Sequence, residues 1–377
     1  MNKLFVVSIT GVVCSMLLTL GMIDSATAGG KKKGGCRSTA KTLYKACYYD
    51  VGDDYQTVRA NCTNLADRDE RNECYQDARS ELRPAHSECR DQYSARRDAC
   101  EILAEDVYDP DPLLDPANQF INPDDVPGLY YPNPYVSIQA GHTFVLSSED
   151  EIVVVTVTDD IREIQGVSCR VVVDVVVEEE EDGGTYEYEP IEVTDDWFAQ
   201  DTIGNVYYCG EIARNYEDGV LRDLDGSFEA GLDYAKSGEL IRIAPAPGDV
   251  HRQEFALGEA EDIIQYEALS TAPSQAEGGD NESFPCAPDL CLKTFEFAPL
   301  EPSATEFKYY LPDTGFVLAV GLEDGELTGE REELVCIGDS LDILSDPTCG
   351  IGDPVELLDE LCDLAPDAFC DNDADED

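Results

Sequence analysis

The sequence is poor in basic residues, and this shortage excludes several classes of partner. It has 25 lysines and arginines against 81 aspartates and glutamates, which gives a formal net charge of −56. So negative a protein repels nucleic acid and anionic lipid and attracts cations or basic partners. We therefore expect a protein that binds no nucleic acid.

Residues and motifs of the common catalytic sites are also scarce. The three histidines, His86, His142 and His251, are far apart in the sequence. The chain has no G-x-S-x-G, H-E-x-x-H, P-loop or dinucleotide-binding pattern. A glycosidase-like pair of carboxylates would not stand out among 81 acidic residues. We expect a protein that is not an enzyme and has no cofactor, with calcium as the one cation that its aspartates could hold.

Long apolar runs are absent except at the N-terminus. Lys3 precedes an apolar run from Leu4 to Leu20, and Ser25-Ala26-Thr27-Ala28 fits an A-x-A cleavage site. Residues 1–28 are therefore predicted to be a secretory signal peptide. No later segment has the length of a transmembrane segment. We expect an extracytoplasmic protein, in the periplasm, on the cell surface or secreted.

Cysteine is plentiful, although no C-x-x-C pair occurs. Without Cys14, which lies in the predicted signal peptide, 14 cysteines remain, and an even number in an oxidising compartment predicts disulfides. After a Gly/Lys leader at residues 29–35, six of them fall in residues 36–107 at helical spacings: Cys36, Cys47, Cys62, Cys74, Cys89 and Cys100. The breakers Asp50-Val51-Gly52-Asp53 and Pro84 predict three helices, near residues 37–49, 54–82 and 85–107.

The pairing of these six cysteines is left open by the spacing. Antiparallel packing of the first two helices would join Cys36 to Cys74 and Cys47 to Cys62. Cys89 and Cys100 would remain, and they cannot bond within one straight helix because 11 residues span about 16 Å. Either a helix breaks or a cysteine pairs outside this domain. A thiolate metal cluster is the alternative, but a disulfide-stapled bundle is favoured because a soft-metal cage needs free thiolates.

The charge changes abruptly after the helical segment. Residues 29–107 carry 14 basic against 15 acidic residues, whereas residues 108–377 carry 10 against 65. The boundary falls in residues 108–136, a Pro/Asp-rich stretch that predicts a stiff, partly extended linker. Its aspartates lack the register of a calcium-binding loop.

Residues 137–337 predict an antiparallel β domain. Stretches such as Glu151 to Thr158 and Val167 to Val177 are rich in β-branched residues, and turn signals such as Asp182-Gly183-Gly184 separate them. The expected fold class is α+β with several domains: a small disulfide-stapled helical bundle followed by a curled antiparallel sheet that resembles a half-barrel. Residues 338–377 are expected to be an acidic tail that contains cysteines, with disorder at its end.

A series of short motifs in this region resembles a known family. The run D-W-F-A-Q-D begins at Asp196, G-N-V-Y-Y at Gly204 and G-E at Gly210, and further matches occur as far as Gly315. Residues 137–337 are similar to a family of secreted bacterial β-domain proteins and lipoproteins with no assigned activity. The resemblance implies a curled sheet distantly similar to the half-barrels of periplasmic lipoprotein carriers. Members often have an aromatic residue where this chain has Cys209, which here could pair with Cys169 across neighbouring strands.

Two classes of function remain. In the first, the half-barrel holds a hydrophobic ligand, and its predicted lining is Trp197, Phe198, Tyr207, Phe255, Phe295, Phe297 and Tyr309, although packing in the core is the commoner role of such rings. In the second, an extracellular structural or assembly protein docks on an unknown protein partner through its helices, with cations on its acidic surface. The oligomeric state is left open.

The remaining cysteines predict further disulfides. Cys286 and Cys291 bracket four residues and are expected to close a small loop. Cys336, Cys349, Cys362 and Cys370 allow three connectivities.

Overall fold

A computed structural model describes residues 34–148, 151–279 and 285–370. The predicted signal peptide, most of the Gly/Lys leader and the last seven residues of the acidic tail lie outside the described residues. Among the described residues, no helix is long and apolar enough to cross a membrane.

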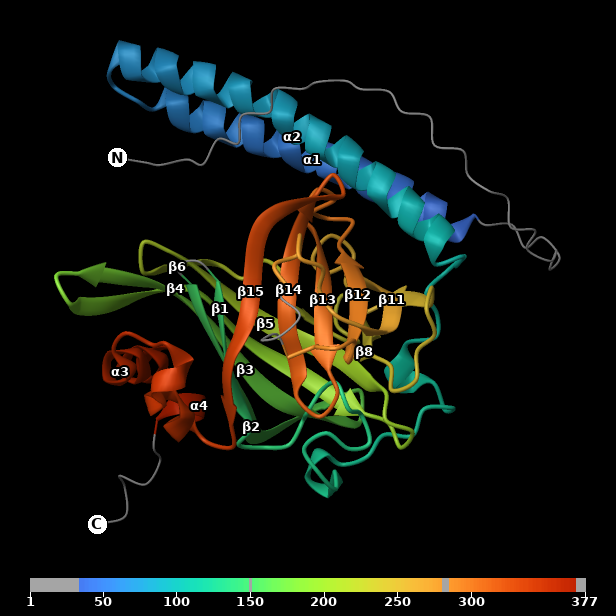
Figure 1. Cartoon of the computed structure of the whole chain (residues 1–377). Helices are drawn as coiled ribbons and strands as arrows, with labels where there is room; N and C mark the ends of the chain where they lie inside the picture. The colour runs from blue at the N-terminus through green and yellow to red at the C-terminus, as the bar shows by residue number, and fades with distance from the viewer. Residues whose placement is uncertain (1–33, 149–150, 280–284, 371–377) are drawn as a thin grey trace. The chain divides into compact units, whose positions relative to one another are not determined.

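The first part of the described chain is a hairpin of two long helices, α1 (Gly35–Thr63) and α2 (Arg68–Ile102), which run antiparallel (Figure 1). The expectation of three helices is therefore wrong, since residues 50–53 continue α1 and Pro84 lies inside α2. The chain turns instead just before Asp67, whose carboxylate accepts hydrogen bonds from the backbone N–H groups of Asp69 and Glu70. This cap satisfies the free donors at the start of α2 and so fixes where the helix begins.

Three disulfides join the two helices. They are Cys36–Cys100, Cys47–Cys89 and Cys62–Cys74, with Cα–Cα distances of 5.8, 5.8 and 5.6 Å. The expected pairs Cys36–Cys74 and Cys47–Cys62 are therefore corrected, because one turn after Thr63 brings the six cysteines together as three successive rungs. Stapling of the helical region by disulfides is confirmed, and no cysteine is left over in it.

Fifteen strands of the described residues form one antiparallel sheet. They are β1 (Thr143–Ser148), β2 (Glu151–Ile164), β3 (Val167–Asp182), β4 (Thr185–Gln200), β5 (Val206–Glu217), β6 (Val220–Asp223), β7 (Phe228–Glu229), β8 (Lys236–Ile241), β9 (Val250–Arg252), β10 (Glu254–Phe255), β11 (Ile263–Thr271), β12 (Cys291–Phe297), β13 (Thr305–Leu311), β14 (Gly315–Glu323) and β15 (Glu326–Gly338). The order along the sheet is β10-β8-β5-β4-β3-β2-β1-β15-β14-β13-β12-β11-β9, and β6 and β7 pair with β5. The fold class expected from the sequence is confirmed.

The two ends of this sheet meet, so that the sheet is a nearly closed barrel (Figure 1). The consecutive short strands β9 and β10 make the seam, because β9 pairs with β11 and β10 pairs with β8. Gly238 of β8 is needed here, since a Cβ atom at this position would lie 2.2 Å from the backbone of Gln253. Only glycine permits two backbones to approach so closely.

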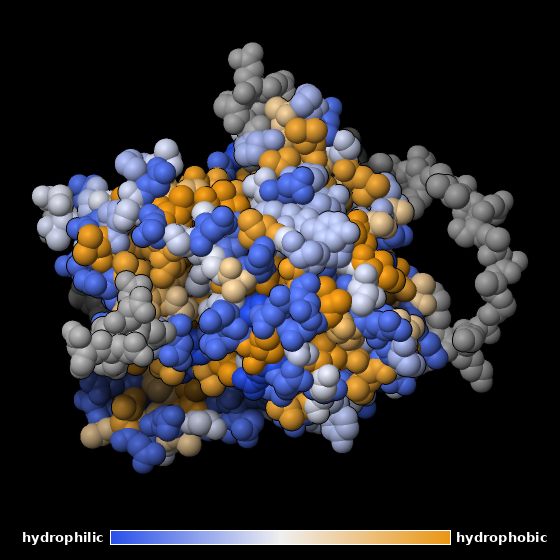
Figure 2. Space-filling model, turned by 90° about the horizontal axis from the view of Figure 1, so that it is seen from below, coloured by the Kyte–Doolittle hydropathy of each residue, from blue (hydrophilic) through white to orange (hydrophobic). Residues whose placement is uncertain are grey.

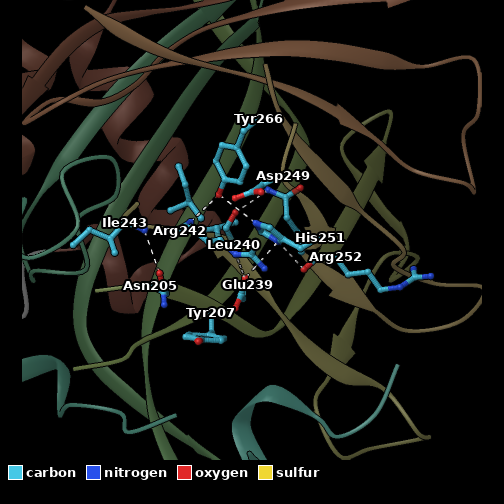
Figure 3. A network of polar contacts seen from close by, with 12 residues as sticks. Asn205, Tyr207, Glu239, Leu240, Arg242, Ile243, Asp249, His251, Arg252 and Tyr266 are labelled. Carbon is cyan, nitrogen blue, oxygen red and sulfur yellow. Dashed lines mark hydrogen bonds and ion pairs between the residues drawn. The ribbon is translucent and has the colours of Figure 1, made fainter. Parts of the chain in front are cut away.

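A network of polar contacts holds the seam (Figure 3). The Tyr266 hydroxyl accepts a hydrogen bond of 2.8 Å from the backbone N–H of Arg242, and it lies 3.2 Å from Nε2 of His251. Burial, and secondarily the charge of Arg242, lowers the pKa of His251 to about 3. His251 is therefore neutral at physiological pH, and its role here is structural.

Both faces of β2 and β3 are covered, which explains their nearly continuous runs of valine. On the outer face, Val154, Val175 and Val177 are fully buried against the C-terminal segment, whose Leu357 and Leu361 are fully buried too. That segment holds α3 (Pro354–Leu364), α4 (Pro366–Phe369) and the 3₁₀ helices Leu341–Ser345 and Pro347–Cys349. It is pinned by Cys336–Cys349 and Cys362–Cys370. The sequence predicted that residues 338–370 would be part of a tail. They are instead ordered and cover the outer face of β2 and β3.

Residues 108–138 are likewise ordered against the barrel, where the sequence predicted a linker. They include the 3₁₀ helices Pro112–Leu114 and Pro123–Asp125. The backbone N–H groups of Ile121 and Asp313 donate to the carbonyls of Gln200 and Pro134. The side-chain amide of Asn133 donates to the Gly204 carbonyl. These contacts reach turns of the sheet that are far apart in sequence. We call residues 119–138 the end cover because they cross one end of the barrel.

Candidate binding site inside the barrel

The barrel contains a partly open cavity of about 270 Å³ next to the end cover. Its lining comes from β1, β2, β3, β4, β8, β13, β14 and β15, and Tyr130, Tyr135 and Val136 of the end cover close it on one side. The volume lies just below the range of about 300–1,000 Å³ that is usual for pockets of drug-sized ligands. A small molecule therefore fits this cavity.

One part of the cavity wall is apolar. It is formed by side chains that point inward, between neighbours on the same strands that point outward. These side chains are Phe144, Leu146, Val155, Val172, Phe198 and Phe316. Because successive residues of a strand point to opposite faces, the valines of β2 and β3 serve both the outer core and this wall. An apolar ligand surface would be removed from water here.

The other part of the wall is acidic. Asp174 of β3, Asp196 of β4 and Glu332 of β15 line the cavity, and Lys308 of β13 is the cation among the lining residues. Asp196 lies opposite Val172, and Val172 and Asp174 share one face of β3, so the two aspartates are diagonal neighbours inside the barrel. Three carboxyl groups thus face the cavity together with one ammonium group.

Lys308 does not neutralise this acidic wall, because its ammonium group is paired with two other carboxylates. Its Nζ lies 3.2 Å from Oε2 of Glu296 and 2.9 Å from Oε1 of Glu306. Glu296 in turn accepts hydrogen bonds from the hydroxyl groups of Tyr310 and Thr294, at 3.1 and 2.8 Å. These strong, mutually satisfied contacts keep the lysine on the β12 and β13 side of the interior.

One phenol sits between two of the buried acids. The Tyr208 hydroxyl is within hydrogen-bond distance of both Asp196 and Glu211, 2.8 Å from Oε2 of the latter. One hydroxyl hydrogen cannot serve two carboxylates, so at least one of the two acids carries a proton. Consistently, burial raises the pKa of Asp196 to about 7, and burial followed by the charge of Asp196 raises that of Glu211 to about 9.

Asp174 lacks a partner. Its Oδ1 atom is buried and accepts no hydrogen bond from any described residue. Burial, and next the charge of Asp196, raises the pKa of this carboxyl well above its usual value. A buried acceptor without a donor costs about 1–3 kcal/mol and so indicates a group that is satisfied by something else.

A second hollow of about 490 Å³ continues the acidic lining past Glu332. Glu151, Glu178, Glu306 and Glu330 line it, with Arg331 as its basic residue. Glu332 belongs to both hollows, and burial raises its pKa to about 7. The interior therefore runs from an apolar end beside the end cover to an increasingly acidic opposite side.

The structure separates the seven side chains that the sequence predicted as ligand lining. Phe198 lines the cavity. Trp197 and Tyr207 lie in an outer cluster with the Cys169–Cys209 disulfide, Leu113 and Ala230. Phe295 stacks with Phe297 and contacts Phe307, on the face of β12 opposite to Glu296. Tyr309 packs against Cys286 and Cys291, and Phe255 packs against Tyr108.

The cysteines of the β domain pair within it. Cys169–Cys209 links β3 to β5, which are separated by β4 rather than adjacent, and Cys286–Cys291 closes the expected loop. All 14 cysteines of the described residues are thus disulfide-bonded. So many disulfides are typical of an extracytoplasmic protein. The described residues contain no group of three or more His, Cys, Asp and Glu side chains that could hold a metal ion.

Sequence reasoning missed the acidic wall, although one signal was present. Asp174 interrupts the run Val171-Val172-Val173-Asp174-Val175-Val176-Val177. A lone carboxylate in the middle of a strand that is buried on both faces is costly, so it marks a site rather than a solvated surface.

These features define the protein as a disulfide-rich α+β protein with a disulfide-stapled helical hairpin and a hollow, acidic barrel. Figure 2 views the face that carries the end cover, where hydrophobic and hydrophilic residues are interspersed rather than segregated.

No family model and no curated protein matches the chain. Two solved structures are similar to it. One, from Bacteroides fragilis, is described as exported with a YmcC-like fold, at 14% identity and a TM-score of 0.23. The other, from Parabacteroides distasonis, is described as a lipoprotein, at 10% identity and a TM-score of 0.26. Each alignment covers 53% of this chain and 96% of the other. Because such TM-scores do not establish a shared fold, membership in the family that the sequence motifs resemble stays a prediction.

Proposed function

We propose that this protein is a non-enzymatic, extracytoplasmic binding module that holds a small, partly apolar ligand inside its barrel. The observation that carries the proposal is the cavity of about 270 Å³, whose lining combines apolar side chains from at least five strands with several carboxyl groups. Concave, mostly apolar cavities with a few convergent polar groups are the usual form of a ligand site.

The polar groups favour binding over catalysis. His142, the histidine that lines the cavity, has its Nε2 atom 2.8 Å from the Tyr130 hydroxyl, and burial lowers its pKa. His251 is part of the seam. No free thiol lies beside either histidine, since every cysteine of the described residues is in a disulfide. The residues of the cavity are thus suited to recognition.

The test uses two small probes of equal shape, benzyl alcohol and benzylamine, with the full secreted chain. We expect at least one of them to bind, as measured by titration calorimetry. Val155→Phe, which fills the cavity, should weaken that binding at least tenfold. The matched control is Val220→Phe, at a position that is 66% exposed on β6, and it should leave binding unchanged. If neither probe binds, or if V155F and V220F behave alike, the proposed function is wrong.

The alternative function, docking through the helices, has one observation in its favour. A groove of about 490 Å³ between α1 and α2 is lined partly by apolar residues, including Val51, Val58 and Leu82. Native mass spectrometry of the protein from its source separates the two functions. A small bound mass supports the barrel, whereas a protein partner that is lost in a Val58→Lys variant supports the helices. Bound calcium would appear in the same spectrum.

A further inference from the structure

Inside the barrel, the carboxyl oxygen that no described residue satisfies belongs to Asp174. Oδ1 of Asp174 is buried at the cavity wall without a hydrogen-bond donor, and the carboxyl groups of Asp196 and Glu332 line the same cavity. Together they form what we call the acidic triad. An occupant that donates a hydrogen bond to Asp174 and carries positive charge would satisfy this oxygen and be stabilised by the other two carboxyl groups of the cavity.

The charges around the acidic triad exclude an anionic occupant. Lys308 is held by Glu296 and Glu306, so it offers no free cation to a carboxylate or phosphate ligand. The neighbouring hollow adds Glu151, Glu178 and Glu330 to the negative side. An anion entering here would meet a field of its own sign in a medium of low dielectric constant.

A bare metal ion is also a poor match. The described residues contain no group of three or more His, Cys, Asp and Glu side chains that could hold one. Much of the cavity wall is hydrocarbon, from residues such as Phe144, Leu146 and Phe316. A metal ion would leave this surface facing empty space or water, whereas an organic cation can cover it.

We infer that the ligand is a small organic amine, whose ammonium group donates to Asp174 between the carboxyl groups of the acidic triad while its hydrocarbon body packs on the apolar wall. This inference rests on the proposed function and specifies the chemical class of its ligand. An ammonium group can donate to Asp174 and is attracted by the neighbouring carboxyl groups. The volume of about 270 Å³ leaves room for a body of at least one ring, since a cavity of about 150 Å³ already holds benzene.

The experiment compares benzylamine, benzyl alcohol and benzoate on the full secreted chain. We expect benzylamine to bind at least tenfold more tightly than benzyl alcohol, and benzoate not to bind. Asp174→Asn should remove most of this preference. Glu187→Gln removes the same charge from an exposed position on β4 and should retain the preference. Thermal unfolding of both variants establishes that each is folded.

The outcomes separate this inference from the proposed function. If benzylamine and benzyl alcohol bind equally and V155F weakens both, the cavity is a ligand site but the amine inference is wrong. The inference is also wrong if D174N and E187Q lose the preference to the same extent, because the effect would then be one of net charge alone. If no probe binds, both the inference and the proposed function fail.

Discussion

Arg170 of β3 and Asp124 of the end cover form an ion pair across the barrel wall, with Nη2 of the arginine 2.6 Å from Oδ1 of the aspartate. Arg170 is 1% exposed, and it also donates hydrogen bonds to the carbonyl groups of Ile138 and Asp159, at 3.2 and 2.8 Å. One buried guanidinium therefore ties the end cover to two strands. We therefore expect the position of the end cover to depend on this side chain.

Replacement of Arg170 tests that dependence. Arg170→Met keeps the apolar stem but leaves two carbonyl groups without donors, so we expect the free energy of unfolding to fall by about 2–4 kcal/mol. Denaturant unfolding measures the change. The control is Arg222→Met, which removes an arginine that is 68% exposed and paired with Glu217, and it should change stability by less than about 0.5 kcal/mol. Equal effects of R170M and R222M would contradict a role of Arg170 in the cover.

The stability of the barrel should fall as the pH rises. Burial raises the pKa of Asp196 to about 7 and that of Glu211 to about 9, and it raises the pKa of Asp174 as well. Between about pH 4 and pH 7 the folded protein therefore binds more protons than the unfolded chain, whose carboxyls ionise near 4. The stabilisation is fully present below pH 4 and is lost as the pH rises through about 7.

Thermal unfolding between pH 5 and pH 8 measures this dependence. We expect the melting temperature to be lower at pH 8, by an amount equivalent to a few kcal/mol at most, since each pKa unit is worth about 1.4 kcal/mol. Asp196→Asn should flatten the profile, whereas Glu187→Gln should leave its slope intact. A melting temperature that rises from pH 5 to pH 8 would show that these acids are ionised in the folded protein.

The affinity for an amine should increase as the pH rises, whereas the stability should decrease. The charged or titratable groups that face Asp174 are Asp196 and Glu192 on β4, Glu211 on β5, Glu332 on β15 and Lys308 on β13. A bound ammonium favours their ionised forms, so binding releases protons and the affinity for benzylamine increases from pH 5 to pH 8. Calorimetry in buffers of different ionisation enthalpy counts the protons. Benzyl alcohol is the control, and its affinity should not rise with pH.

The disulfides of the helical hairpin should differ in how much they contribute to the free energy of unfolding. Cys36–Cys100 spans 64 residues and Cys62–Cys74 spans 12. If a disulfide acts mainly by restricting the unfolded chain, removing the first should cost about 4 kcal/mol and removing the second about 3 kcal/mol. Urea unfolding of the two double Cys→Ser variants, followed by the far-ultraviolet signal of the helices, compares them. A larger loss for the short loop would show that packing rather than chain entropy dominates.

The class of the fold followed from the sequence, whereas the position of the site did not. Runs of β-branched residues such as Glu151 to Thr158, separated by turn signals, identify a sheet, because the pattern is local. The two-residue period of a strand assigns Trp197 and Phe198 to opposite faces, but it does not show which face is inner. Both faces of this sheet are covered, so hydrophobicity alone cannot distinguish the cavity wall from the outer core.

The helical hairpin illustrates a second limit. The residues near Asp53 and Pro84 disfavour a helix, yet a helix that is joined to its neighbour by disulfides tolerates them. The cysteine steps of 11, 15, 12, 15 and 11 are symmetric about the central step. This symmetry predicts one turn between Cys62 and Cys74, and it is a stronger signal than either breaker because three disulfides depend on it.

The cover over the valine face gives the C-terminal segment a consequence for biosynthesis. α3 and α4 follow all fifteen strands in the chain, so a newly made barrel shows Val154, Val175 and Val177 to water until Leu357 and Leu361 dock. Exposed apolar strands of this kind are sites of aggregation. If the last two disulfides, Cys336–Cys349 and Cys362–Cys370, do not form, we therefore expect the molecules to associate with one another. The yield of soluble protein should then depend on correct oxidation of these four cysteines.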